Sequence, residues 1–235
     1  HAEIATILNN IAEIYHSMGM YEQSLKMHQR ALQVREKSLG PEHPQTALTL
    51  SNLATLYYTI GIYDRSLSLF QRALMIREKK LGPDHIETAN SLNTLAESYR
   101  HMGIFDQALF FYQRSLKICQ EKLGMENPHN ATIMNNMALL FHEMGSYEKA
   151  LTLNLRALKI KENSLGQEHL ETTISLTNLA GLYKAMGAFD KAILLYQRSL
   201  KIREKSLNPD HPDIAKNLIN IVTLYYSMGE YDKAL

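Results

Sequence analysis

The sequence has 235 residues, 45% of them hydrophobic and 21% charged, a composition that builds a core rather than a disordered chain. Lysine and arginine number 25 against 24 aspartates and glutamates, so the net charge of +1 excludes the strong field that draws proteins to nucleic acid or anionic membranes. A lone cysteine, Cys119, excludes an internal disulfide framework, and no apolar run reaches the roughly 18 residues that span a bilayer.

Glycine marks the ends of the predicted elements at a constant spacing of 42 residues. The first series comprises Gly19, Gly61, Gly103, Gly145, Gly187 and Gly229. The second series comprises Gly40, Gly82, Gly124 and Gly166, with Asn208 in the fifth place. Because glycine and asparagine are the residues that most readily adopt a left-handed backbone, we expect a helix-ending turn at each of these positions, Asn208 included.

The stretches between these turns carry apolar residues at helical spacing. Over residues 4–18 the apolar side chains recur every three or four positions, which predicts a helix with one buried stripe. Residues 21–39 repeat the pattern, so each repeat has a first stretch of about 16 residues and a second of about 19. Pro44 and Pro212 stand where first helices are expected to begin, since proline is tolerated at the first helical position.

Each repeat is therefore predicted to be a helix hairpin, and one hairpin cannot bury its apolar stripe without a neighbour. We expect an all-α solenoid of six stacked antiparallel helix pairs, the last incomplete. It would form a single domain over residues 1–235 and be a fragment of a longer protein. Small residues such as Ala96 and Ala138 are expected where two helices cross closely. Aromatic residues such as Tyr57 and Tyr99, four positions before a glycine, are predicted to pack between helices.

The residues also resemble a known family. The pattern Leu-x-x-Leu-Ala-x-x-Tyr-x-x-x-Gly of residues 50–61 resembles the tetratricopeptide repeat, whose usual period is 34 residues. The longer period and the segment 72–85, RALMIREKKLGPDH, resemble the long repeats of kinesin light chains. This resemblance implies a right-handed superhelix whose first helices line a concave face, and a protein-binding role without catalysis. The basic residue that kinesin light chains carry after the inter-helix glycine is absent, because Met20 and Ile62 stand there.

Asparagine recurs on one face of the first helices, although it is a mediocre residue for a helix interior. The column comprises Asn10, Asn52, Asn136, Asn178 and Asn220, with Thr94 in the remaining repeat. Two interpretations remain open: the amides could bond to a neighbouring helix, or they could pair with the backbone of an extended peptide. The resemblance favours peptide binding, and the double substitution Asn136→Ala, Asn178→Ala is then expected to weaken it at least about tenfold, the cost of one or two hydrogen bonds.

Side chains on the same face, one or two turns further on, are expected to select the bound peptide. They are Glu13, His16, Tyr58, Glu97, Arg100, His142, Lys184 and Tyr226. Because this set mixes acidic, basic and aromatic groups, a clamp that recognises only carboxylates is not expected.

Other motifs indicate structural roles. The histidines His43, His85, His169 and His211 lie one repeat apart, too dispersed for one metal ion, and we expect them to start helices. Arginines recur on the second helices together with Glu36, Glu78, Glu162 and Glu204, which predicts an ion-paired outer face rather than a nucleic-acid stripe. These arginines are Arg30, Arg72, Arg114, Arg156 and Arg198. The glycosylation pattern at Asn130 is expected to be silent inside a cell. No catalytic motif or cofactor site is recognised.

We therefore expect a cytoplasmic scaffold that binds an extended segment of a protein partner, with a kinesin-light-chain-like cargo adaptor as one form. The alternatives are a structural module that assembles through its outer faces, or the sensor or autoinhibitory arm of a signalling ATPase. Exposed repeat ends could also self-associate. Nucleic acid and membrane insertion are not expected.

Overall fold

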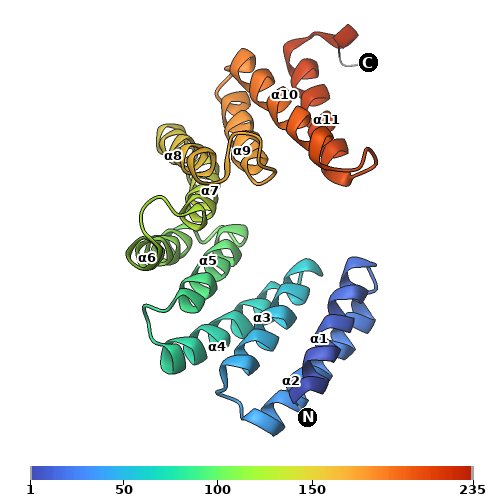
Figure 1. The fold of residues 1–235 in the computed structure, drawn as a ribbon, viewed down its shortest axis with the longest axis vertical. Coiled ribbons are helices and arrows are strands. Elements are labelled where there is room, and N and C mark those ends of the chain that lie inside the picture. Colours follow the sequence, from blue (N-terminus) through green and yellow to red (C-terminus); the bar gives the residue numbers. More distant parts are fainter. Residues whose placement is uncertain (1, 234–235) are drawn as a thin grey trace. The chain divides into compact units, whose positions relative to one another are not determined.

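The computed structural model describes residues 2–233, whose regular structure is entirely helical (Figure 1). The helices are α1 (Ala2–Ser17), α2 (Tyr21–Leu39), α3 (Pro44–Thr59), α4 (Tyr63–Leu81), α5 (Ile86–His101), α6 (Phe105–Leu123), α7 (Pro128–Glu143), α8 (Tyr147–Leu165), α9 (Thr172–Ala185), α10 (Phe189–Ser206), α11 (Pro212–Met228) and a short 3-10 helix, η1 (Tyr231–Lys233). The expected alternation is confirmed, because α3 has 16 residues and α4 has 19.

Two kinds of glycine turn separate the helices. After the first helix of a repeat the turn is left-handed, as at Gly229 with φ 76° and ψ 10°. After the second helix the glycine has a positive φ with an extended ψ, as at Gly82 with φ 102° and ψ 155°. The latter combination is open to glycine and to almost no other residue.

The helix-ending turn expected at Asn208 is present, but its backbone conformation differs. In the described residues every positive φ belongs to a glycine, so Asn208 does not adopt a left-handed backbone. Helix α10 ends at Ser206, and Leu207 is already extended with φ −123° and ψ 160°. The reason is that this turn needs the extended, positive-φ conformation, and an asparagine side chain does not fit there. The helix therefore stops one residue earlier than its counterparts.

The helix starts follow the sequence prediction. Pro44 and Pro212 are the first residues of α3 and α11. The Nδ1 atom of His85 accepts a hydrogen bond from the backbone N–H of Glu87 at 3.1 Å, and His43 and His211 cap in the same way. His169 accepts from Glu171, which lies before the start of α9, so the expected cap is absent there. The other three histidines thus satisfy backbone donors that a helix start leaves without partners.

The loop before each of α3, α5, α7 and α9 is closed by a side chain from that helix. The hydroxyl of Thr88 donates to the carbonyl of Gly82 at 2.8 Å, and the amide of Asn130 donates to the carbonyl of Gly124 at 2.7 Å. Asn130 is fully buried. Its glycosylation pattern is therefore part of a structural turn.

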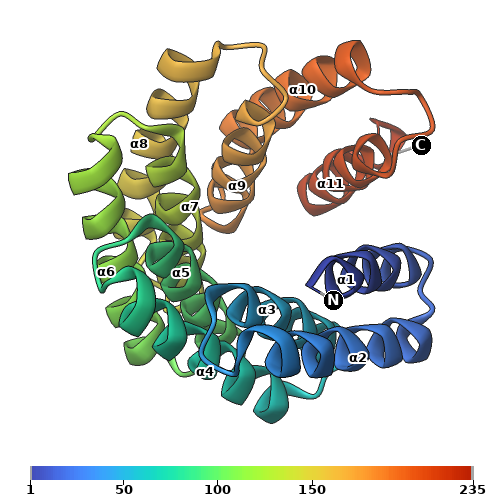
Figure 2. The same ribbon diagram turned by 60° about the horizontal axis from the view of Figure 1, so that its bottom comes forward.

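The chain divides into two compact units, His1–Lys122 and Leu123–Leu235. Within the first unit, α1, α3 and α5 form one layer and α2, α4 and α6 form a second (Figure 2). Within the second unit, α7, α9 and α11 form one layer and α8 and α10 the other. We call these the odd-helix layer and the even-helix layer of each unit. The all-α solenoid of antiparallel pairs is confirmed, whereas the single domain stays a prediction.

Apolar side chains fill the space between the two layers of each unit. In the first unit Ala47, Leu50 and Ala73 are fully buried and pack together. The aromatic column belongs to this packing, as predicted: Tyr57 is buried, and the Tyr99 ring stacks on Phe111 with centroids 5.5 Å apart. The core therefore leaves the polar sides of the odd helices as the candidate surface for function.

Candidate functional site

The predicted asparagine column lies on the odd-helix layers. Asn10 is exposed, and Asn52, Asn136, Asn178 and Asn220 are half-buried. Within the described chain, no hydrogen bond engages the side-chain amides of Asn10, Asn52, Asn178 and Asn220. These four amides thus keep both donor and acceptor capacity.

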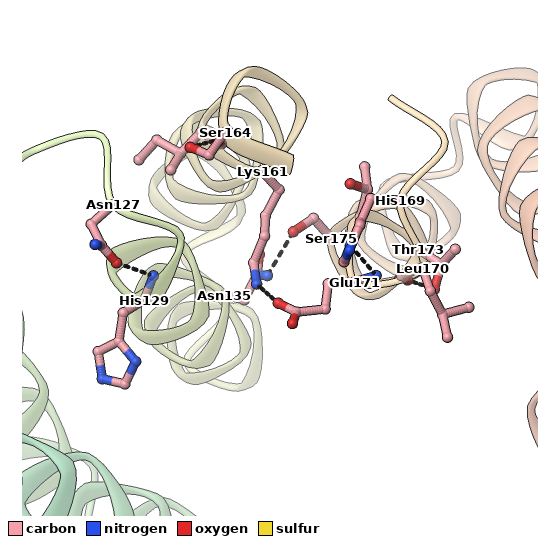
Figure 3. Close-up of polar contacts among 12 residues, drawn as sticks. Asn127, His129, Asn135, Lys161, Ser164, His169, Leu170, Glu171, Thr173 and Ser175 are labelled. Carbon is pink, nitrogen blue, oxygen red and sulfur yellow. Dashed lines mark hydrogen bonds and ion pairs between the residues drawn. The ribbon is translucent and has the colours of Figure 1, made fainter. Parts of the chain in front are cut away.

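The hydrogen bond to a neighbouring helix, which the sequence also allowed for this column, is made by two asparagines that stand one residue earlier, Asn9 and Asn135. Asn9, which is 5% exposed, donates from Nδ2 to the hydroxyl of Thr49 on α3 at 3.0 Å. Asn135, which is 2% exposed, donates in the same way to Ser175 on α9 at 2.8 Å (Figure 3). Adjacent asparagines therefore face different surroundings, and the buried one joins neighbouring odd helices.

A column of buried cations, which the sequence reasoning missed, supports the same junctions. It comprises Arg35, Arg77, Lys161 and Arg203 on the even helices. Arg77 donates from Nη1 to Ser51 at 3.0 Å and to Ser91 at 2.5 Å. Lys161 pairs with the carboxylate of Glu171, beside the Asn135 amide (Figure 3).

The buried arginines need their acceptors because desolvation disfavours charge. Burial lowers the pKa of Arg35, Arg77 and Arg203. Arg35 donates to the hydroxyls of Thr6 and Thr49 and to the carbonyl of Gln45, so groups from two odd helices surround one guanidinium. Each cation thus ties a repeat to the next one. The signal was present in the sequence as a basic residue at 42-residue spacing in four of five repeats, with Cys119 at the remaining position.

Two of the predicted flanking side chains bridge neighbouring odd helices. His16 Nε2 lies 3.3 Å from the hydroxyl of Thr59 on α3. Lys184 donates from Nζ to the hydroxyl of Thr223 on α11 at 3.2 Å. Both bridges are exposed, so a ligand can reach them.

Three other flanking residues are rings packed beside the turns. The Tyr58 ring lies edge-on to His101, with centroids 5.3 Å apart. His142 lies 5.7 Å from the Tyr147 ring, and Tyr226 is 67% exposed. These positions therefore offer ring surface on the odd-helix layers.

The charged flanking residues differ in accessibility. The Glu13 carboxylate lies 3.4 Å from His28 Nε2, and burial, followed by the charge of His16, lowers the pKa of His28 to about 4. Glu97 is half-buried, and no ion pair or hydrogen bond engages its carboxylate in the described chain. Arg100 is only 8% exposed, which removes it from the open part of the face.

A hollow of about 320 Å³ opens between α3 and α5 in the first unit. Two predicted residues, Tyr58 and Glu97, line it together with Thr94, the exception in the asparagine column. Its remaining lining residues are Thr55, Thr59, Phe70 and Ser98. Sequence reasoning did not find the hydroxyl residues or Phe70, because nothing in their spacing distinguishes them from helix surface.

The even-helix layer carries the expected ion pairs. Arg72 pairs with Glu36 at 2.6 Å, and Arg198 pairs with Glu162 at 2.7 Å. Each pair joins an even helix to the preceding even helix in the same unit, and all four side chains are partly exposed. Such pairs each contribute at most about 1 kcal/mol, so they guide stacking more than they stabilise it.

The repeat geometry agrees with the comparisons. The tetratricopeptide repeat model matches residues 3–79, 61–121 and 129–205, most of the sequence. The chain belongs to the tetratricopeptide repeat family. Tetratricopeptide repeats generally form scaffolds for protein interactions rather than enzymes.

Several solved structures share this tetratricopeptide fold. BtubC (BKLC) from P. vanneervenii is 25% identical, with a TM-score of 0.70 over 92% of this chain and 84% of that one. A putative kinesin light chain with nearly identical TPR-like repeats from Podosopora anserina is 22% identical, with a TM-score of 0.71 over 88% and 98%. PilW, a type IV pilus biogenesis factor, is 16% identical, with a TM-score of 0.68 over 98% and 89%. The curated proteins contain no match to the sequence.

Two further site classes were sought in this tetratricopeptide repeat protein. Among residues 2–233, no three histidine, cysteine or acidic side chains are grouped so that they could hold a metal ion. None of the described helices has the length and apolar character of a membrane span.

Proposed function

We propose that the odd-helix layer binds an extended segment of a partner protein. The observation that carries this proposal is the set of unengaged amides on the odd helices: Asn10, Asn52, Asn178 and Asn220 have free hydrogen-bonding capacity within the described chain, whereas Asn9 and Asn135 are used inside the stack. An amide matches the donor and acceptor of a peptide unit, so this column would recognise backbone irrespective of sequence. Neighbouring side chains such as His16 and Lys184 would then select among segments.

The expected affinity is modest. Each amide contact contributes about 0.5 to 1.5 kcal/mol, and ordering a flexible segment offsets part of the gain. Micromolar binding, about 8 kcal/mol, is therefore the expected range.

The test uses the 235-residue chain and a fluorescent pool of short random peptides. Asn178→Ala combined with Asn220→Ala should weaken pool binding at least about tenfold, since two backbone contacts are lost. The melting temperature should stay nearly unchanged, because neither amide has a partner to lose in the described chain. Asn135→Ala is the matched control and should lower the melting temperature. Equal loss of stability in both variants would contradict the proposal.

A cytoplasmic cargo adaptor resembling kinesin light chains is the specific form of scaffold that we favour. It is supported by the long repeat and by the similarity to a putative kinesin light chain, which shows the fold alone at 22% identity. Pull-down with candidate cargo segments would test it, and a loss of capture in the asparagine double variant is the expected result.

Assembly through the even-helix layer is a second candidate. A hollow of about 510 Å³ lies on α2, α3 and α4, lined by Leu32, Tyr57, Arg65 and Leu69 among others. Crosslinks from a captured partner to this hollow or to Arg114, with none to Asn178, would favour it over the first proposal.

A further inference from the structure

The hollow between α3 and α5 combines aromatic and methyl surface with a group of hydroxyls and one carboxylate. Thr55 and Thr59 donate their hydroxyl protons to the carbonyls of Ser51 and Thr55, at 3.1 and 3.0 Å. Thr94 and Ser98 donate to backbone carbonyls in the same way, each at 3.1 Å. A hydroxyl has one proton to donate, so Thr55, Thr94 and Ser98 present only lone pairs to the hollow. The Thr59 oxygen also lies 3.3 Å from His16 Nε2.

Glu97 adds a negative charge, and among residues 2–233 no ion pair or hydrogen bond engages its carboxylate. Arg100, one turn further along α5, is buried at 8% exposed, and its guanidinium lies 2.7 Å from His101 Nε2. No lysine, arginine or histidine lines the hollow. The carboxylate therefore lacks the cation that a half-buried charge would need in a filled site.

In the first repeat the carboxylate at this position has a polar neighbour. Glu13 occupies the position of Glu97 in the first repeat and lies 3.4 Å from the imidazole of His28. In the hairpin of Glu97 the position of His28 is taken by Tyr112, which is fully buried, and in the preceding repeat, at the wall of the hollow, by Phe70, which is apolar and 5% exposed. Phe70 and the Tyr58 ring thus supply aromatic surface, which attracts cations, where a basic group is missing.

We propose that this hollow binds the side chain of a lysine or arginine of the extended segment, which deepens the function proposed above and rests on it. The cation donates to the Glu97 carboxylate and to the hydroxyl lone pairs, while its aliphatic stem lies against Phe70. Thr94 contributes by being small and acceptor-only where the other repeats carry asparagine, since an amide would add a competing donor. The hollow would therefore select a side chain, whereas the asparagines of the column would bind the peptide backbone.

The pocket is tested first without any peptide. Propylguanidinium and butylammonium are titrated into the chain while the threonine methyl resonances are followed by NMR, with n-butanol as the uncharged probe. Saturable shifts at Thr55 and Thr94 with the cations, and none with butanol, are expected. Glu97→Gln should weaken the cations about tenfold, the cost of one charge-assisted hydrogen bond. Glu13→Gln is the matched control and should leave the cation titration unchanged.

Peptide pools then connect the pocket to the proposed function. Pools that differ only in one central residue, lysine, arginine, leucine or glutamate, are compared by fluorescence anisotropy. The basic pools should bind at least about fivefold more tightly, and Glu97→Gln or Thr94→Asn should abolish that preference.

The outcomes separate the two proposals. Absence of saturable cation shifts, or shifts that survive Glu97→Gln, would overturn the pocket whatever the peptides do. Pools that bind and respond to Asn178→Ala with Asn220→Ala, yet show no basic preference, would also overturn the pocket while leaving the scaffold intact. Cation binding with no pool binding would instead count against peptide recognition by the odd-helix layer.

Discussion

Replacing Arg77 by alanine should destabilise the protein far more than replacing Arg72, although both arginines lie on α4. Arg77 is 7% exposed and donates to the hydroxyls of Ser51 and Ser91, at 3.0 and 2.5 Å. Bonds from a charged donor contribute about 1.5 to 3 kcal/mol each, and removing the desolvation cost of the guanidinium offsets part of their loss. We expect a loss of about 2 to 4 kcal/mol in the free energy of unfolding once the cavity is included.

Arg72 is the control, because its ion pair with Glu36 is partly exposed to solvent. The two side chains are 38% and 32% exposed, so solvent screens the interaction and its loss should cost at most about 1 kcal/mol. Urea unfolding followed by circular dichroism measures both variants, with the m-value checked because stacked repeats can unfold in parts. Similar small losses for Arg77→Ala and Arg72→Ala would refute the view that buried cations hold the repeats together.

Three further changes follow from the described contacts. Gly181→Ala should stabilise the protein by about 0.5 to 1 kcal/mol, because the added Cβ meets the Tyr196 hydroxyl at an ordinary 3.6 Å and the helix gains propensity; a loss in urea unfolding would contradict this. The lowered pKa of His28, about 4, means that the unfolded chain binds the proton more tightly. Stability should therefore fall by up to about 3 kcal/mol between pH 7 and pH 4, and thermal melts of His28→Phe should lose most of that slope. Asn135→Ala should cost about 1 to 2 kcal/mol in urea unfolding, whereas Asn178→Ala should change stability by less than about 0.5 kcal/mol; equal costs would argue against separate roles.

The helices and their order could be predicted because glycine spacing and apolar periodicity are local signals. The different roles of Asn9 and Asn10 could not be predicted in this way. The two residues are adjacent on one helix, and their side chains differ by about 100° in direction. Which of them meets the next helix depends on how the hairpins stack. Sequence reasoning selected Asn10 for function without recognising that Asn9 holds the inter-repeat bond.

The buried cations and the hollow were missed for related reasons. A basic residue on a helix is normally assigned to the surface, and the repeating Arg35, Arg77, Lys161 and Arg203 show their burial only after the repeats are stacked. The acceptor character of the hollow depends on where the hydroxyl protons are directed, and residue spacing does not reveal this. The backbone conformation of Asn208 was mispredicted for a different reason. Two turns with positive φ can differ in ψ, and the sequence does not show which ψ a turn requires.

Because Asn9 secures the stack while the amide of Asn10 beside it is unengaged in the described chain, the surface of the first hairpin can be changed independently of its packing. Asn10, Asn52, Asn178 and Asn220 can be changed one at a time, and under the proposed function each replacement would alter one contact with the bound segment. Thr94 is a natural example of such an edit. A library randomised only at these places should therefore yield many folded members with altered ligand preferences.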